Sequence, residues 1–192
     1  MSRAPGTRRR QIIAVAAELF AARGFANVTV DEIGDAAGVS GPALYHHFTG
    51  KEALLGEMLI DISDYLLAGG RRCVAEGGDD VLERLIRFHA EFAVSDRALI
   101  TVQFRDLVHA ANADRAKIRR LQSNYALLWA DELVRRHPQH DHRSAHAAVH
   151  ATFGLLNSTP FSSRLPSAQM VELLATMASS ALAAAQPANA VS

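Results

Sequence analysis

The sequence contains a single cysteine, Cys73, among its 192 residues. One thiol excludes an intrachain disulfide and a zinc site built from several thiolates, and it suits a reducing compartment, so we expect a cytoplasmic protein. No apolar run approaches the roughly 20 residues that a membrane-spanning helix requires. The N-terminal arginines precede an amphipathic segment that includes Glu18, which indicates a helix of the mature protein and not a signal peptide.

Aromatic residues are also few, at 6%, and the formal net charge is zero. A chain that is 49% hydrophobic, rich in alanine and poor in aromatic residues favours closely packed helices over a β-sandwich. The neutral total does not indicate nucleic-acid binding. However, residues 1–51 carry six Lys or Arg and four acidic residues, a net of +2, which is the sign expected of a DNA-facing end.

Capping and stop residues predict three short helices near the N-terminus, at about residues 7–23, 30–37 and 40–48. Each follows or begins with a side chain that can cap a first turn: Thr7, Thr29 and Ser40. Glu32 lies three residues after Thr29, which predicts a capping box. Glycines after the first two segments stop those helices.

Apolar residues at three- and four-residue steps predict six longer helices from Lys51 onward. No segment shows the alternation of a strand. We therefore expect an all-α fold of about nine helices, with a first domain at residues 1–50 and a second at residues 51–192.

The segment 31–48 has the pattern of a helix-turn-helix. Gly38 permits the sharp turn between two helices, and the apolar Val39 and Leu44 can fill the angle between them. In such a motif the second helix enters the major groove of DNA. Its exposed face would then carry mostly small or aromatic residues.

This region resembles the TetR family of transcriptional regulators. The resemblance rests on Ala17-Glu18-Leu19-Phe20, Arg23-Gly24-Phe25, Thr29-Val30-Asp31-Glu32-Ile33, Ala36-Ala37-Gly38-Val39-Ser40, Leu44-Tyr45-His46-His47-Phe48 and Lys51-Glu52-Ala53-Leu54-Leu55. It covers roughly the first third of the chain. The remainder fits the family only in length and in its number of helices.

The resemblance implies an N-terminal DNA-binding domain and a C-terminal domain for ligand binding and dimerisation. It assigns phosphate contacts to Thr29, His47 and Lys51. It assigns base and backbone contacts to Ser40, Gly41, Pro42, Ala43, Tyr45 and His46. Gly41, Pro42 and Ala43 have no long polar side chain that could read a base. We therefore expect recognition to depend on Tyr45, His46, thymine methyl groups, DNA shape and the arginines at 8–10. Those arginines could equally form a solvated charged end.

The resemblance also implies a homodimer that reads a pseudo-palindrome with half-sites about 34–36 Å apart. We expect the last two helices to form its interface through Ala145, Val149, Phe153, Leu174, Met177 and Ala181. We expect a small apolar effector, such as an acyl-coenzyme A or fatty acyl compound, to contact Phe88, Phe92, Phe104, Arg105, Trp129 and Phe153. Repression released by this effector is the function most typical of the family.

Alternatives remain at this point. A protein partner could control DNA binding without a ligand. A hydrolase with a Cys73 and His89 nucleophile pair is a remote alternative, and we expect no enzyme activity, no metal and no cofactor. The histidines at 142, 146 and 150 share one helix face, which can be a solvated surface, an interface or a pH-sensitive contact.

Overall fold

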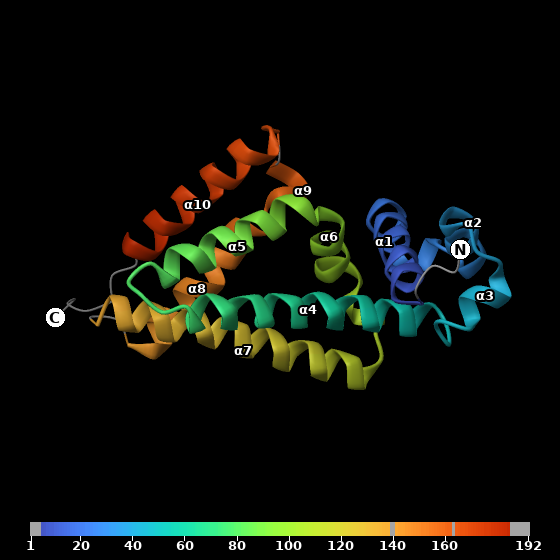
Figure 1. Ribbon diagram of the computed structural model, residues 1–192, viewed down its shortest axis with the longest axis horizontal. Helices are drawn as coiled ribbons and strands as arrows, with labels where there is room; N and C mark the ends of the chain where they lie inside the picture. Colours follow the sequence, from blue (N-terminus) through green and yellow to red (C-terminus); the bar gives the residue numbers. More distant parts are fainter. Residues whose placement is uncertain (1–4, 139–140, 163, 185–192) are drawn as a thin grey trace. The chain divides into compact units, whose positions relative to one another are not determined.

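The computed structural model describes residues 5–138, 141–162 and 164–184, which form helices joined by turns and loops, with no strand among them (Figure 1). The elements are α1 Pro5–Arg23, η1 Phe25–Asn27, α2 Val30–Ala37, α3 Gly41–Tyr45, α4 Lys51–Ala75, α5 Val81–Ser95, α6 Arg97–Asp106, η2 Leu107–His109, α7 Asn112–Arg136, α8 His142–Leu156, α9 Thr159–Ser162 and α10 Ser167–Ala184. The all-α prediction is confirmed. The short α9 was not predicted.

The chain folds into two compact units. Unit 1 comprises Met1–Ser63 and Ala98–Arg119, and unit 2 comprises Asp64–Arg97 and Arg120–Ser192. Helices α4 and α7 contribute residues to both units. The sequence predicted a DNA-binding domain at residues 1–50 and a ligand-binding domain at residues 51–192. This functional division stays a prediction.

Unit 1 has a core in which α1, α2 and α3 pack on the first half of α4. The side chains with least exposure come from helix faces with three- and four-residue spacing, among them Ile12, Ala16, Phe20, Ile33, Leu44, Leu55 and Leu59. Burying such a stripe stabilises helices that would be marginal alone.

Unit 2 has its own core, in which α10 packs against α5 and α8. Trp129 on α7 is its largest fully buried side chain. The core also includes Leu85, Ile86, Ala145, Val149, Leu174 and Ala178. Its helix α10 buries one stripe and leaves the opposite stripe exposed.

Three local expectations need correction. Helix α1 begins at Pro5, so Thr7 lies inside it and does not cap it; proline at a first helical position has no amide hydrogen to lose. Helix α3 ends at Tyr45 instead of Phe48. A pair of adjacent glycines favours a break in a helix, but α4 continues through Gly69 and Gly70 to Ala75.

Candidate functional site

The first turn of α2 is closed by the capping box that the sequence predicted. Thr29 Oγ1 accepts a hydrogen bond from the backbone N–H of Glu32 at 3.2 Å, and the Glu32 carboxylate accepts from the Thr29 backbone N–H at 2.7 Å. Arg23 donates to the same carboxylate at 2.7 Å. These bonds, that from the Thr29 backbone first, lower the pKa of Glu32 to about 2. The carboxylate is therefore ionised at neutral pH and fixed in place.

Gly38 makes the turn between α2 and α3. Its φ of 65° and ψ of 41° are left-handed, a conformation that a residue with a Cβ adopts at a cost of roughly 1–2 kcal/mol. The Val39 amide donates to the Gly34 carbonyl at 2.9 Å and closes the end of α2. The turn predicted at Gly38 is confirmed.

Helix α3 presents its predicted contact residues on the surface. Ser40 caps it by accepting from the Ala43 amide at 3.4 Å. Leu44 is 1% exposed and anchors the inner face, whereas Tyr45 is 56% exposed and the neighbouring His46 is also exposed. At its end the His47 amide bonds to the Leu44 carbonyl three residues back at 2.9 Å, which tightens the last turn. The exposed side of α3 therefore lies opposite an apolar side that packs in the core of unit 1.

Lys51 has partners inside unit 1. Its ammonium donates to the carbonyls of Phe25 and Val28, both at 2.8 Å, and lies 4.3 Å from the ring centre of Phe25. The Phe25 carbonyl also accepts from the Val28 amide at 3.4 Å, so Lys51 adds a charged donor at the end of η1 and to the Val28 carbonyl that follows it. These bonds give Lys51 a structural role, and the phosphate contact expected of it stays a prediction.

An aromatic cluster surrounds His89 in unit 2. The ring of His89 lies nearly parallel to those of Tyr125 and Phe153, with ring centres 5.8 and 4.9 Å away, and Trp129 meets it edge-on at 5.9 Å. Phe92 also meets His89 edge-on, at 5.9 Å. Three of the predicted effector contacts, Phe92, Trp129 and Phe153, therefore come together here.

Polar groups of this cluster are buried. His89 Nδ1 lies 3.3 Å from the Tyr125 hydroxyl and Nε2 lies 3.1 Å from Asn157 Oδ1. Burial lowers the pKa of His89 to about 4 and raises the pKa of Tyr125. A neutral His89 fits these partners if Nε2–H donates to Asn157 and Nδ1 accepts from Tyr125. The indole N–H of Trp129 is buried and completes no hydrogen bond among the described residues.

The sequence interpretation missed Tyr125 and Asn157 and gave His89 a different role. Both ring nitrogens of His89 are engaged, and burial, followed by the charge of Glu76, raises the pKa of the Cys73 thiol. The Cys73 and His89 pair therefore lacks the thiolate and the free base that nucleophilic catalysis requires. The four-residue step from His89 to Leu85 and Ala93 was the available signal that His89 faces the core.

The other three predicted effector contacts, Phe88, Phe104 and Arg105, have other partners or are exposed. Phe104 is 67% exposed in unit 1. Arg105 forms an ion pair with Asp106 and donates to the carbonyls of Phe20 and Ala21, where α1 ends. Phe88 packs on Tyr65, with ring centres 5.4 Å apart, and not on His89. The effector contacts expected at Phe88, Phe104 and Arg105 stay a prediction.

The predicted interface residues divide into buried and exposed ones. Ala145, Val149 and Leu174 are buried in the unit 2 core, so their side chains cannot reach a second copy. Phe153 belongs to the cluster around His89. Met177 and Ala181 are exposed on α10, together with Leu173, which the prediction did not include. The apolar residues that the sequence assigned to the interface therefore include residues of the intrachain core as well as exposed ones.

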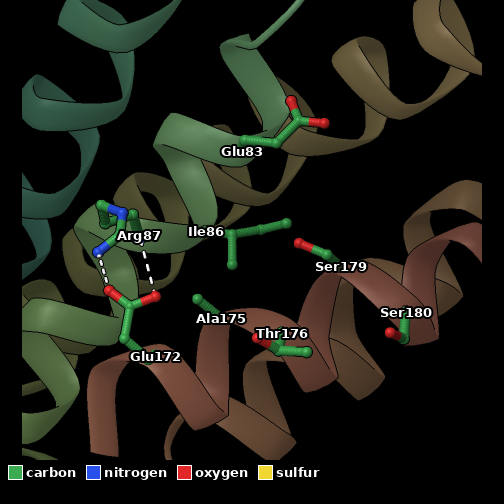
Figure 2. Close-up of a pocket in the computed structure, with 8 residues that line it drawn as sticks. All are labelled: Glu83, Ile86, Arg87, Glu172, Ala175, Thr176, Ser179 and Ser180. Carbon is green, nitrogen blue, oxygen red and sulfur yellow. Dashed lines mark hydrogen bonds and ion pairs between the residues drawn. The ribbon is translucent and has the colours of Figure 1, made fainter. Parts of the chain in front are cut away.

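A groove follows the contact between α5 and α10 (Figure 2). Its volume is about 350 Å³, and Arg87 crosses it to Glu172 through two bonds of 2.6 and 3.1 Å. Ile86 and Ala175 line its base, and hydroxyls of Thr176, Ser179 and Ser180 line one wall. None of the predicted effector contacts lines this groove.

The histidine face of α8 holds no metal site of three or more ligands within the described ranges. His146 and His150 have ring centres 4.5 Å apart, and His142 Nδ1 lies 3.6 Å from Asp131 Oδ1. Burial and the neighbouring His146 lower the pKa of His150.

No helix in the described part of the chain is long and apolar enough to cross a membrane.

Comparisons with known proteins agree with this architecture. Residues 12–58 match the family described as bacterial regulatory proteins, tetR family. The HTH-type transcriptional repressor KstR2 of Rhodococcus jostii is 34% identical over 125 residues, which are 64% of this chain and 61% of that repressor. The chain thus spans about three-fifths of the length of this curated relative.

Solved structures show the same fold. A regulatory protein in the tetR family from Rhodococcus RHA1 has a TM-score of 0.79 at 21% identity and covers 95% of this chain and 98% of its own. The regulator FadR of Bacillus subtilis, solved with stearoyl-CoA, has a TM-score of 0.73 at 19% identity, with coverages of 94% and 99%. Residues 12–58 thus match the N-terminal region of bacterial regulatory proteins of the tetR family, and the chain as a whole shares the fold of these solved regulators.

Proposed function

We propose that the protein is a transcriptional regulator that binds a pseudo-palindromic DNA site as a homodimer. The observation that carries this proposal is the exposure of Tyr45 at the end of α3 and of His46 just after it, next to the buried Leu44 and after the left-handed turn at Gly38. A short helix held this way can enter a major groove while its base stays packed. The proposed DNA contacts are Thr29, Ser40, Gly41, Pro42, Ala43, Tyr45, His46 and His47.

Base readout in this proposal depends on few groups. Tyr45 and His46 supply the polar atoms, and the exposed ring of Pro42 and the half-buried Ala43 offer apolar contacts for thymine methyl groups. The remaining specificity would come from DNA shape. Because Glu32 is tied to Thr29 and Arg23, its negative charge is partly compensated beside the proposed phosphate contact.

The proposed dimer uses the exposed stripe of α10 that contains Leu173, Met177 and Ala181. Leu173 and Met177 are 43% and 46% exposed, which is unusual for large apolar side chains spaced one turn apart. A two-fold axis would bring this stripe against its own copy. Dimerisation would place two α3 helices on successive half-sites.

The proposed effector is a small apolar acyl compound that binds in unit 2 at the cluster around His89. Support comes from the aromatic walls, where the ring centres of Trp129 and Phe153 lie 5.0 Å apart, and from the buried indole N–H of Trp129, which can donate to a carbonyl of an acyl group. FadR, a structural neighbour, was solved with stearoyl-CoA. Binding that favours a DNA-incompetent state would release the operator and relieve repression.

In vitro selection tests the DNA proposal. Wild-type protein applied to a random 30-base-pair duplex library should enrich a pseudo-palindrome, and Tyr45→Ala should weaken binding to that selected duplex by about tenfold. Tyr45 is exposed, so thermal stability should change little. Tyr65→Ala is a matched control, because Tyr65 is 50% exposed on α4. Failure to enrich any sequence would contradict the proposal.

Stearoyl-CoA serves as the probe for the effector. It should raise the unfolding temperature and weaken binding to the selected duplex, and Trp129→Phe, which removes only the N–H and the second ring, should reduce both effects. If shorter and longer acyl-CoA probes all leave stability and DNA affinity unchanged, the effector proposal fails. Control by a protein partner would then be the better explanation.

A further inference from the structure

Two adjacent arginines of α1 have partners on either side of α3. Arg8 donates to the carbonyl of Gly38, in the turn before α3. Arg9 forms an ion pair with Glu57 of α4, and its guanidinium carbon lies 4.8 Å from the ring centre of Phe48, just after α3. All of these residues belong to unit 1.

Helix α3 depends on such contacts because it has only five residues. A helix of this length does not persist alone in water, so the segments on either side of it determine its direction. Phe48 is 3% exposed, and the cation over its ring adds to the apolar packing that holds it. The Gly38 carbonyl is fixed by a charged donor, which makes a stronger hydrogen bond than a neutral one.

The charges of these arginines are largely used within the protein. Arg9 pairs with a carboxylate whose side chain is only 23% exposed, so its attraction for a phosphate is reduced. Arg8 is half-buried and also donates to Gln11 Oε1 at 3.1 Å. Neither residue has the arrangement of a loose basic arm.

We infer that Arg8 and Arg9 are positioning residues of the helix-turn-helix, which fix α3 from the protein side and make no phosphate contact. This inference rests on the proposed DNA binding for its functional consequence. It replaces both earlier interpretations of these arginines, the DNA-contacting arm and the solvated charged end. Its physical basis is that adjacent residues of one rigid helix hold both flanks of α3.

The salt dependence of binding to the selected duplex distinguishes positioning from phosphate contact. Each phosphate contact contributes about 0.9 to the slope of log affinity against log salt concentration, so losing one per protomer would reduce the slope of a dimer by about 1.8. We expect Arg8→Gln to weaken binding by about tenfold with the slope unchanged. A reduced slope, or an unchanged affinity, would overturn the inference for Arg8.

A charge exchange tests Arg9. The single variants Arg9→Glu and Glu57→Arg should each weaken binding by about tenfold or more, because each sets like charges together. The double variant restores the ion pair, and we expect its affinity to return to within about threefold of wild type. If Arg9 instead contacted a phosphate, the double variant would remain as weak as Arg9→Glu, and the inference would fail.

Hydrogen exchange without DNA separates this inference from the proposed function. Arg8→Gln should increase amide exchange in residues 38–45 by about tenfold while the core of α4 stays protected. Arg119→Gln removes the same charge from an exposed position of α7 in the same unit and should leave that exchange unchanged. Equal exchange in wild type and Arg8→Gln would overturn the inference, even if no DNA site were found.

Discussion

Basic side chains in unit 1 bond repeatedly to backbone carbonyls. Lys51 donates to the carbonyls of Phe25 and Val28, and Arg105 donates to those where α1 ends. Carbonyls at helix ends have no partner within the helix, so a charged donor stabilises each connection. At the scale of single residues, these cations therefore contribute to the stability of unit 1.

Replacement of Lys51 should reveal this role. We expect Lys51→Met to lower the free energy of unfolding by about 2 kcal/mol, because two partly buried carbonyls lose a charged donor. Urea denaturation measures the change. Lys117→Met is the matched control, since Lys117 is exposed on α7 and should change stability by less than about 0.5 kcal/mol. Equal losses in the two variants would contradict the assignment.

The buried His89 should make stability depend on pH. Its pKa of about 4 lies below the ordinary value of 6.5, so the unfolded chain binds a proton that the folded chain excludes. The contribution is complete above pH 6.5 and is lost as pH falls from about 6.5 to about 4, by up to roughly 3 kcal/mol. His150, whose pKa is also lowered, adds in the same direction.

Urea denaturation at pH 7 and pH 5 tests this expectation. His89→Gln should flatten most of the decline between the two pH values. Glu32 does not interfere, because its pKa is lowered from 4.5 to about 2 and its contribution is lost only at lower pH. A decline as steep in His89→Gln as in wild type would show that His89 is not the titrating group.

At the scale of elements, glycines let α4 approach its aromatic neighbours. A Cβ on Gly69 would lie 2.1 Å from Phe88 Cζ, and one on Gly70 would lie 2.7 Å from Tyr125 Cε2. These glycines cost helix propensity but allow the rings to rest on bare backbone. The sequence pattern alone indicated a break at this point.

Substitution of Gly69 should therefore destabilise a helix that alanine normally favours. We expect Gly69→Ala to lower the free energy of unfolding by about 1–3 kcal/mol through overpacking against Phe88. Adding Phe88→Leu should recover part of the loss. Gly154→Ala on α8 is the control, since a Cβ there meets nothing within 4 Å and should stabilise slightly. A stabilising Gly69→Ala would refute the packing argument.

At the scale of the whole molecule, the proposed regulator requires two copies. Met177→Lys places a charge in the exposed apolar stripe of α10 and should convert a dimer to monomer at micromolar concentration in analytical ultracentrifugation. Thr176→Lys, one residue away and lining the groove beside α5, should leave the dimer intact. If both variants remain dimeric, the interface lies elsewhere.

The sequence alone identified the features that depend on neighbours in the chain. The capping box of Thr29 and Glu32, the turn at Gly38 and the helix-turn-helix were predicted correctly, because caps and turns are formed by residues three or four positions apart. The all-α class followed from the spacing of apolar residues. Repeated local patterns of this kind need no knowledge of distant contacts.

Only the tertiary structure decided which apolar and charged groups meet. Lys51 lies 23 residues from Val28 in the chain and Arg105 lies 85 from Phe20, so their partners could not be found from spacing. A helical stripe likewise does not reveal which part faces its own core, which is why Ala145, Val149 and Leu174 were assigned to an interface. Long-range packing settles such choices because it selects among side chains that are equivalent in local pattern.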